Sequence, residues 1–418
     1  MRRPSGAVVG LPHLRPVRLG QMRMMPAAGH SPAWAVLDER RRGTRFLSLP
    51  VRSVLNSPAS THMGFWSINP YVGCEFGCTY CYARDTHRYV VERAGGKDGK
   101  GGKGGKDGKG GKVVAERSEA PASQQTELVT LQPLPSLPSF PSFPSFPSFP
   151  PPVVEEISHL DPEDAFERRI LIKTEVADVL ARTLNPARLG DHSLVIGTAT
   201  DPYQPAERRF RLTRQILEVL LRYRGLSIEV ITKSPLVTRD LTLLQQLSER
   251  HEVSINISLA TLDARLARRL ELRSPVPAAR IRALRRLARG GVHAGLLIAP
   301  IVPGITDSRK GLRQLMAAAK EAGARYVVGS ALRLGPAARH RFLPHLVREF
   351  PELAERYERH YGKSEGVSAD YQEALTRRLR RLQHELGFPA DEIGTRRRQQ
   401  LEGRPPRTPA ADEQPALL

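Results

Sequence analysis

The fold is decided by the stretch HSLVIGTATDPYQPAERRFRLTRQILEVLLRYRGLSIEVITKS, residues 192–234. Two short apolar runs, 193–198 and 227–232, have the length of buried strands, and between them residues 208–223 repeat apolar side chains at a helical spacing. A strand, a helix and a second strand in this order predict a βα unit, in which the two strands lie parallel in one sheet.

The same alternation continues toward the C-terminus. Further strands are predicted at 253–259, 293–299 and 324–329, and an earlier one at 66–72. Further helices are predicted at 239–249, 277–289 and 308–322. Six strands with intervening helices predict an α/β fold, a partial (β/α)6 TIM-like barrel. In such a fold the functional side chains lie at the C-terminal ends of the strands.

Composition divides the rest of the chain. Residues 94–152 combine a Lys/Gly tract with a Pro/Ser/Phe repeat, and because neither can pack a core we expect a low-complexity linker insertion. The Phe-containing repeat is interpreted as a spacer, with partner binding as the alternative. The predicted organisation is a disordered basic N-terminal extension at 1–45, the barrel at 46–93 and 153–335, a C-terminal helical extension at 336–394 and a disordered tail at 395–418.

The C-terminal extension is predicted to form amphipathic helices at 349–361 and 368–386. We expect them to cap the barrel, with guidance of substrate as the alternative. The Arg-rich run at 377–381 fits a nucleic-acid face and equally a solvated helix.

The chain of 418 residues has a net charge of +21, which favours nucleic acid as a partner. The excess extends beyond the tails, since residues 191–330 hold 23 Lys and Arg against 12 Asp and Glu. The alternative is that this charge only solvates helix faces. The N-terminus lacks an uninterrupted signal-peptide core, and no apolar run reaches the roughly 18 residues of a spanning helix. We therefore expect a cytoplasmic protein without membrane contact.

All three cysteines lie in the segment SINPYVGCEFGCTYCYAR, residues 67–84. An odd number of cysteines at the spacing Cys-x3-Cys-x2-Cys argues against disulfides and for reduced thiolates that bind a metal. Thiolates from Cys74, Cys78 and Cys81 can hold a [4Fe-4S] cluster and leave one iron without a protein ligand. S-adenosylmethionine (SAM) can chelate that iron through its amine and carboxylate, and an electron from the reduced cluster then cleaves SAM to a 5′-deoxyadenosyl radical, which abstracts hydrogen from a substrate.

Two other metal sites fit the loop less well. A closed zinc site uses four ligands, and His87, the nearest downstream histidine, does not stand at a zinc-finger spacing. An electron-transfer ferredoxin supplies a fourth cysteine for each cubane, and this chain has only three.

The cysteine loop, with Tyr80 before its last cysteine, resembles the signature of the radical SAM superfamily. Neighbouring segments narrow the resemblance to the spore photoproduct lyase-like branch, also described as DNA repair photolyase-related. These segments are NPY at 69–71, YAR at 82–84, GTATDPYQPAE at 197–207, ITKSPLVTRD at 231–240, ISLATLD at 257–263 and APIVPGITD at 299–307. The resemblance covers residues 47–334 apart from the insertion, and it implies a barrel of the radical SAM type.

The resemblance implies roles for residues that follow the strands. Tyr80 is expected beside the SAM adenine and Lys233 beside the SAM carboxylate. The implied cofactor-binding residues are Tyr80, Thr198, Thr200, Asp201, Lys233 and Ser258, with the turn at 300–307 near the adenine. Plain structural alternatives stay open, because Tyr80 fits ordinary packing, Asp201 fits the start of a turn and Ser258 fits a backbone hydrogen bond.

One departure bears on the chemistry. In spore photoproduct lyases a cysteine returns a hydrogen to the product radical, and its counterpart here is Ala199. This argues against thymine-dimer cleavage by the same route. Tyr80 and Tyr82, which flank Cys81, are the candidate catalytic residues for a tyrosine-based hydrogen relay.

The leading functional hypothesis is a radical SAM enzyme of the lyase or repair type that acts on nucleic acid. A flavodoxin- or ferredoxin-type protein would supply the electron. The alternatives are a radical SAM modifier of a protein or small molecule, and a non-catalytic iron–sulfur module that binds nucleic acid or senses redox state.

Overall fold

A seven-stranded sheet forms the centre of the protein in a computed structural model that describes residues 36–40, 43–61, 63–87 and 162–389. Its strand order is β11-β10-β9-β8-β7-β4-β3, and every neighbouring pair from β4 to β11 is parallel. The six parallel strands are β4 (Trp66–Ile68), β7 (Leu194–Ile196), β8 (Ser227–Thr232), β9 (Glu252–Ser258), β10 (Ala294–Ile301) and β11 (Val327–Ala331). The predicted partial (β/α)6 barrel is therefore confirmed.

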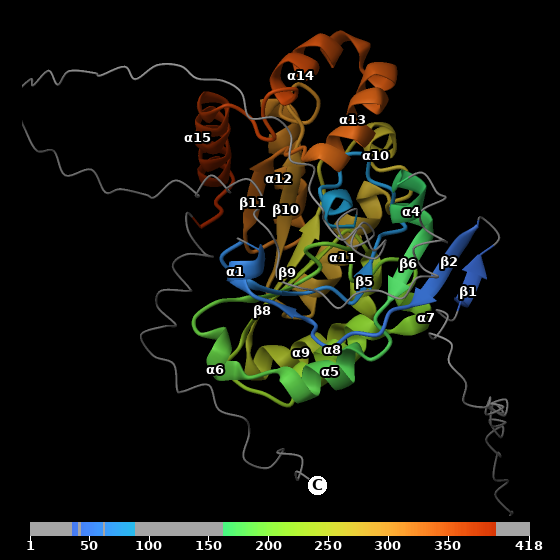
Figure 1. Ribbon diagram of the computed structural model, residues 1–418. Helices are drawn as coiled ribbons and strands as arrows, with labels where there is room; N and C mark the ends of the chain where they lie inside the picture. The colour runs from blue at the N-terminus through green and yellow to red at the C-terminus, as the bar shows by residue number, and fades with distance from the viewer. Residues whose placement is uncertain (1–35, 41–42, 62, 88–161, 390–418) are drawn as a thin grey trace, which may run out of the picture.

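Helices cover the outer face of this sheet (Figure 1). The helices between barrel strands are α5 (Val176–Thr183), α6 (Pro186–Leu189), α7 (Glu207–Phe210), α8 (Leu212–Leu220), α9 (Leu241–Arg250) after the 3-10 helix η1 (Pro235–Asp240), α10 (Ala264–Leu270), α11 (Pro277–Arg289) and α12 (Arg309–Glu321). The helix predicted at 277–289 matches α11 in both bounds. Its leucines Leu284 and Leu287 are fully buried, because they lie on the face that packs on the sheet.

Two predicted elements are interrupted. The helix predicted at 208–223 breaks into α7 and α8 because Arg211, between them, has a left-handed backbone with φ of 54°. The strand predicted at 66–72 breaks at Asn69 and Pro70, so that β4 stays in the barrel while β5 (Tyr71–Val72) joins another sheet. Proline lacks the backbone donor that a continuous ladder needs.

A second sheet has the order β1-β2-β6-β5, with β1 (Val36–Arg40), β2 (Thr44–Ser48) and β6 (Arg169–Ile172). Its strands β1 and β2 pair antiparallel and lie partly inside the N-terminal extension that was predicted as disordered to residue 45. That boundary is wrong, because β1 and the first two residues of β2, Thr44 and Arg45, already form paired strands. Directly after the boundary, β2 also pairs with β6, and Phe46 and Leu47 are completely buried. The remaining short elements are β3 (Leu55–Asn56), α1 (Pro58–Thr61) and α4 (Pro162–Arg168).

The C-terminal helices pack on the barrel in two places: residues 336–361 cap the end that carries the cysteine loop, and residues 369–385 lie beside β11 and α12 at the edge of the sheet (Figure 1). They are α13 (Pro336–Glu349), the 3-10 helix η2 (Pro351–Leu353), α14 (Ala354–Tyr361) and α15 (Ala369–Glu385). Buried side chains from α13 and α14 form one apolar cluster with the cysteine loop, in which Phe342 and Tyr357 have ring centroids 5.9 Å apart. The cap thus shields the loop from water.

Three predictions concern residues outside the described part of the chain: the insertion at 94–152, the tail at 395–418, and most of the extension at 1–35. In the described part, no helix is long and apolar enough to cross a membrane.

Truncation of the cap core should destabilise the protein. Phe342 is fully buried, so Phe342→Ala is expected to lower the free energy of unfolding by about 3–5 kcal/mol in urea titrations. Val347→Ala is the matched control on the same helix, because Val347 is 55% exposed and its truncation should cost about 0.5 kcal/mol or less. Equal losses in the two variants would show that α13 does not bury this face.

Candidate functional site

The cysteine loop depends on two glycines with left-handed backbones. Gly73 has φ of 87° and Gly77 has φ of 62°. A Cβ at Gly73 would lie 2.7 Å from the carbonyl oxygen of Phe166, and one at Gly77 would lie 2.7 Å from Nη2 of Arg273. The positive φ favours glycine at both positions. At Gly73 a side chain would also clash with backbone, whereas at Gly77 it would displace the end of the Arg273 side chain.

Residues that follow β7 hold the first half of the loop. Thr200 Oγ1 donates to the Gly73 carbonyl at 2.7 Å, and Gln204 Nε2 donates to the same oxygen at 3.2 Å. The backbone N–H of Glu75 donates to Gln204 Oε1 at 3.0 Å. Thr200, a predicted cofactor-binding residue, therefore positions the backbone next to Cys74.

The segment after α10 holds the second half. Thr79 donates to the Leu270 carbonyl through its backbone N–H at 3.0 Å and through Oγ1 at 2.9 Å. The backbone N–H of Arg273 donates to the Phe76 carbonyl at 2.9 Å. Two segments nearly 200 positions apart in the sequence thus run side by side, and this pairing fixes the loop against the end of the barrel.

The three cysteines are free thiols, with Cys74 and Cys78 buried and Cys81 half-buried. Burial, followed by the nearby Asp201 and the other two thiols, raises the pKa of Cys74 well above its ordinary value. Cys78 Sγ lies 3.5 Å from Ser274 Oγ. The fit to an iron–sulfur cluster rests on this donor set of three neighbouring thiols in a sheltered loop. In residues 36–87 and 162–389, apart from the gaps, no three potential ligand side chains already converge on a metal position.

Beside the loop, Lys233 reaches across the C-terminal ends of the strands. Its Nζ donates to Tyr80 Oη at 3.3 Å, to Ser258 Oγ at 3.1 Å and to Glu271 Oε1 at 2.9 Å. Burial alone would lower the pKa of Lys233, but the Glu271 carboxylate raises it above the ordinary value, so the ammonium stays charged. The structure therefore brings together the three predicted residues Tyr80, Lys233 and Ser258.

Glu271 was missed by the sequence analysis, although it is the centre of this network. It is 3% exposed, accepts hydrogen bonds from Tyr80 Oη and Lys233 Nζ, and pairs with Arg280 of α11. Burial would raise its pKa, yet the two cations hold that pKa well below its usual range. The available signal was an acidic residue at the start of ELRSP, directly after an Arg-rich helix, and such a residue usually lies in solvent.

The Asp201 carboxylate is held by hydrogen bonds within the protein. Its carboxylate accepts from Thr232 Oγ1 at 2.7 Å, from the Tyr203 N–H at 2.9 Å and from the Lys233 N–H at 2.7 Å. These bonds join the turn after β7 to the end of β8 and set where the Lys233 side chain begins. A part for Asp201 in cofactor binding stays a prediction.

Thr198 and Tyr82 lie together at the open side of the loop. Thr198 Oγ1 accepts from Asn69 Nδ2 at 3.1 Å, and its carbonyl accepts from Tyr82 Oη. Tyr82 is 42% exposed, whereas Tyr80 is 5% exposed. The two candidate catalytic tyrosines thus differ in environment, and of the two Tyr82 is the one that solvent reaches.

The predicted adenine turn at 300–307 faces the C-terminal helices. Asp307 caps its own turn by accepting from the Gly304 N–H at 2.9 Å and also accepts from Tyr371 Oη of α15 at 2.7 Å. Tyr357 Oη of α14 donates to the Pro303 carbonyl at 2.6 Å. The described contacts attach this turn to the cap, and its place beside adenine stays a prediction.

Removal of the Glu271 charge should destabilise the fold. Glu271→Gln leaves Lys233 and Arg280 buried without their carboxylate, and loss of one partner from such a pair costs about 3–5 kcal/mol. The measurement is urea unfolding of the metal-free protein. Glu373→Gln is the control, since Glu373 pairs with Arg377 on the exposed surface of α15 and should contribute under about 1 kcal/mol. A Glu271→Gln protein as stable as this control would contradict the network.

Comparisons with known proteins found several similarities. An uncharacterized protein of Mycobacterium tuberculosis is 27% identical over 339 residues, which cover 81% of this chain and 79% of that protein. An uncharacterized protein of Methanocaldococcus jannaschii is 32% identical over 114 residues, or 27% of this chain and 42% of that protein. A mutant spore photoproduct lyase with bound AdoMet and dinucleoside spore photoproduct aligns with a TM-score of 0.49 at 13% identity, covering 82% of this chain and 80% of that one.

Residues 156–316 match the family model of the radical SAM superfamily. The match spans β7 to β10, with the strand ends that carry Thr200, Lys233 and Ser258, but it leaves out the cysteine loop. In the structure, the strand ends of the matched region contact the cysteine loop, through Thr200 to Gly73 and through Lys233 to Tyr80. Over residues 156–316 the chain is therefore similar to the radical SAM superfamily.

Proposed function

We propose that the protein is a radical SAM enzyme of the lyase or repair type that acts on nucleic acid, with Cys74, Cys78 and Cys81 as ligands of a [4Fe-4S] cluster. When bound, the cluster and SAM supply a 5′-deoxyadenosyl radical that removes a hydrogen atom from the substrate. A flavodoxin- or ferredoxin-type protein would supply the electron.

One observation carries the proposal. Three neighbouring free thiols lie in a loop that β7 and the segment after α10 hold from both sides, and a charged lysine reaches the same place from β8. A structural zinc site would use four ligands, whereas the chain has three cysteines and its nearest downstream histidine, His87, does not stand at a zinc-finger spacing.

The side chains around the loop have distinct tasks in this proposal. Lys233 presents its ammonium to the SAM carboxylate, and Ser258 and Glu271 orient that ammonium. Tyr80 offers a flat apolar ring beside the second and third cysteines, 5.5 Å from Lys233 Nζ. Tyr82, partly exposed, is the proposed hydrogen donor to a product radical in place of the cysteine that Ala199 replaces.

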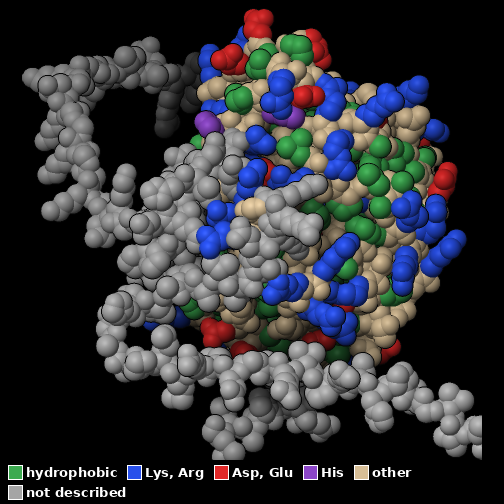
Figure 2. Space-filling model, turned by 90° about the vertical axis from the view of Figure 1, so that its right-hand side faces the viewer, with side chains coloured by type: hydrophobic (Ala, Val, Ile, Leu, Met, Phe, Trp, Pro, Cys, Tyr) green, Lys and Arg blue, Asp and Glu red, His purple; other side chains and the backbone are tan. Residues whose placement is uncertain are grey.

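Nucleic acid is the proposed substrate because the charge excess extends to the mouth of this site. The exposed arginines Arg265 and Arg268 project from α10. That helix borders a small hollow lined by Leu259, Ala260, Thr261, Ala267, Leu270 and Glu271. Figure 2 shows Lys and Arg side chains scattered over the described part of one face of the molecule, so many of them only keep that surface solvated. Arg265 and Arg268 differ from the other surface arginines because α10 borders the hollow that Glu271 lines.

SAM cleavage tests the reaction. The protein is reconstituted anaerobically with iron and sulfide, reduced with dithionite and mixed with SAM, and 5′-deoxyadenosine is measured by chromatography. We expect product from the wild type and none above background from Cys78→Ala, because two thiolates do not hold the cluster in place. A wild-type protein with a verified four-iron cluster that forms no 5′-deoxyadenosine would refute the proposed reaction.

Salt dependence of binding tests the substrate class. Each phosphate contact contributes about one unit to the slope of log K against log salt, so Arg265→Gln and Arg268→Gln should each lower the slope for duplex DNA by about one. Arg289→Gln is the control, because Arg289 is exposed at the C-terminal end of α11, the helix that leads to the opposite end of the barrel. Slopes unchanged in both α10 variants, or changed equally in the control, would contradict nucleic-acid binding at this site.

A further inference from the structure

Arg84 lies buried beneath the cysteine loop. Its backbone N–H donates to the Cys81 carbonyl at 3.3 Å, and its side chain is only 3% exposed. Nη2 donates to the Cys78 carbonyl at 3.2 Å, and the guanidinium lies 4.7 Å from the centroid of the Phe166 ring. A fixed positive charge therefore lies directly against the backbone that carries the second and third cysteines.

The carboxylate that neutralises Arg84 is shared. Glu167 of α4, with 6% of its side chain exposed, pairs with Arg84 and also with Arg273, while Arg341 of α13 lies 3.9 Å from it. In the described ranges no other carboxylate pairs with Arg84. Arg84 thus shares its one paired carboxylate with a second arginine, Arg273.

Two donors of the same guanidinium have no acceptor. Nε and Nη1 of Arg84 are buried and make no hydrogen bond in the protein. Buried donors in native structures almost always have an acceptor, so two buried donors without one need an explanation at the site itself. The Arg84 side chain, three positions after Cys81, therefore combines a shared carboxylate with two unpaired donors.

We propose that Arg84 is the fixed counter-charge of the iron–sulfur cluster, and that it stabilises the reduced cluster more than the oxidised one. This rests on the proposed function, since it needs a cluster on the three cysteines. Reduction adds one electron from an external donor, and no bond forms or breaks. In a buried site a pre-positioned cation favours the more negative state, and nearby charges, hydrogen bonds and burial are what set cluster potentials.

The test is a redox titration of the reconstituted protein, with the reduced cluster followed by electron paramagnetic resonance. Arg84→Gln should lower the ratio of reduced to oxidised cluster about tenfold at a given potential, which is a shift of about 59 mV to more negative values for a one-electron couple. Glu167→Gln removes a negative charge from the same group and should shift the midpoint in the opposite direction. Arg84→Lys, which keeps the charge, should stay close to the wild type.

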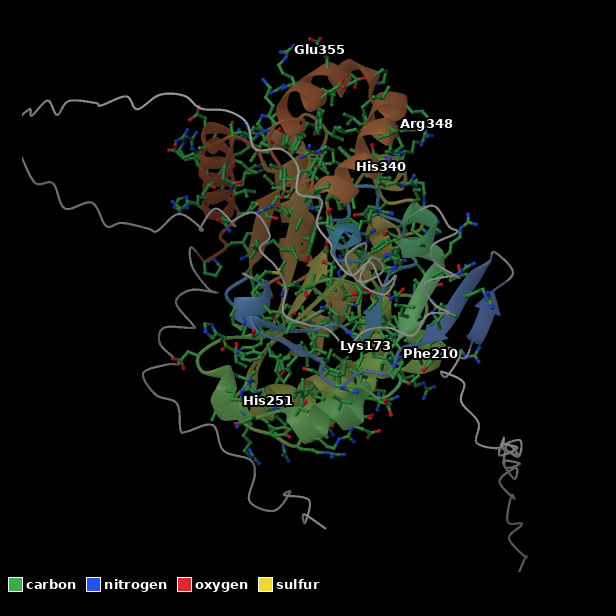
Figure 3. The ribbon with its side chains drawn as sticks, in the orientation of Figure 1. Lys173, Phe210, His251, His340, Arg348 and Glu355 are labelled. Atoms are coloured by element: carbon green, nitrogen blue, oxygen red, sulfur yellow. The ribbon has the colours of Figure 1, made fainter. Side chains whose placement is uncertain are left out.

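Arg359→Gln is the matched control, because it removes the same charge from the exposed Arg359–Glu355 pair of α14. Glu355 lies at the outer end of the cap, far from the loop (Figure 3). The proposal is overturned if Arg84→Gln keeps the wild-type midpoint, or if Arg84→Lys shifts as far as Arg84→Gln. Should Arg84→Gln bind no iron, equal midpoints in Glu167→Gln and the wild type overturn it. A wild type that binds no cluster would instead refute the proposed function.

Discussion

One buried carboxylate, Glu271, joins three parts of the molecule. It receives Tyr80 from the cysteine loop, Lys233 from the end of β8 and Arg280 from α11. Arg280 also donates to the carbonyls of Ser258 and Pro275, so its guanidinium connects the network to β9 as well. A charge removed from water is stable only among well-placed partners, and this requirement restricts how the loop, the strands and α11 can lie relative to each other.

The parallel sheet makes this arrangement accessible. Because all six barrel strands point the same way, the residues that follow β7, β8 and β9 meet at one edge. Thr200 then reaches the loop backbone, Asp201 fixes the start of the Lys233 side chain, and Ser258 accepts from that lysine. The cap adds apolar cover from α13 and α14, so the thiols and the ion pairs share one sheltered end of the barrel.

Much of the barrel could be predicted from the sequence, because buried parallel strands and amphipathic helices have strong periodic patterns. The helix at 277–289 and the strand at 227–232 were predicted with the bounds of α11 and β8. The break at Arg211 could not be predicted, since arginine carries no preference for a left-handed backbone. Neither could the second sheet, because β1, β2, β5 and β6 are short and pair across distant parts of the chain.

The site was predictable where neighbours in sequence share a task, as the three cysteines do. It was not predictable where partners meet only through the fold. Glu271 lies 191 positions from Tyr80, and nothing in its local sequence separates it from a solvated glutamate. Asp201 accepts the hydrogen bond of a turn-forming aspartate from the Tyr203 N–H, and the same carboxylate also holds the Lys233 backbone, a link that only the fold reveals.

The contact between the His87 and Phe166 rings, whose centroids are 5.4 Å apart, has a consequence for chain length. It holds together the two points where residues 88–161 leave and rejoin the described structure. For a flexible chain, doubling the length of a closed loop costs only about 0.6 kcal/mol. A flexible segment attached at these two points can therefore differ in length by dozens of residues at little cost in free energy, while the ring contact and the Arg84–Glu167 pair stay as they are.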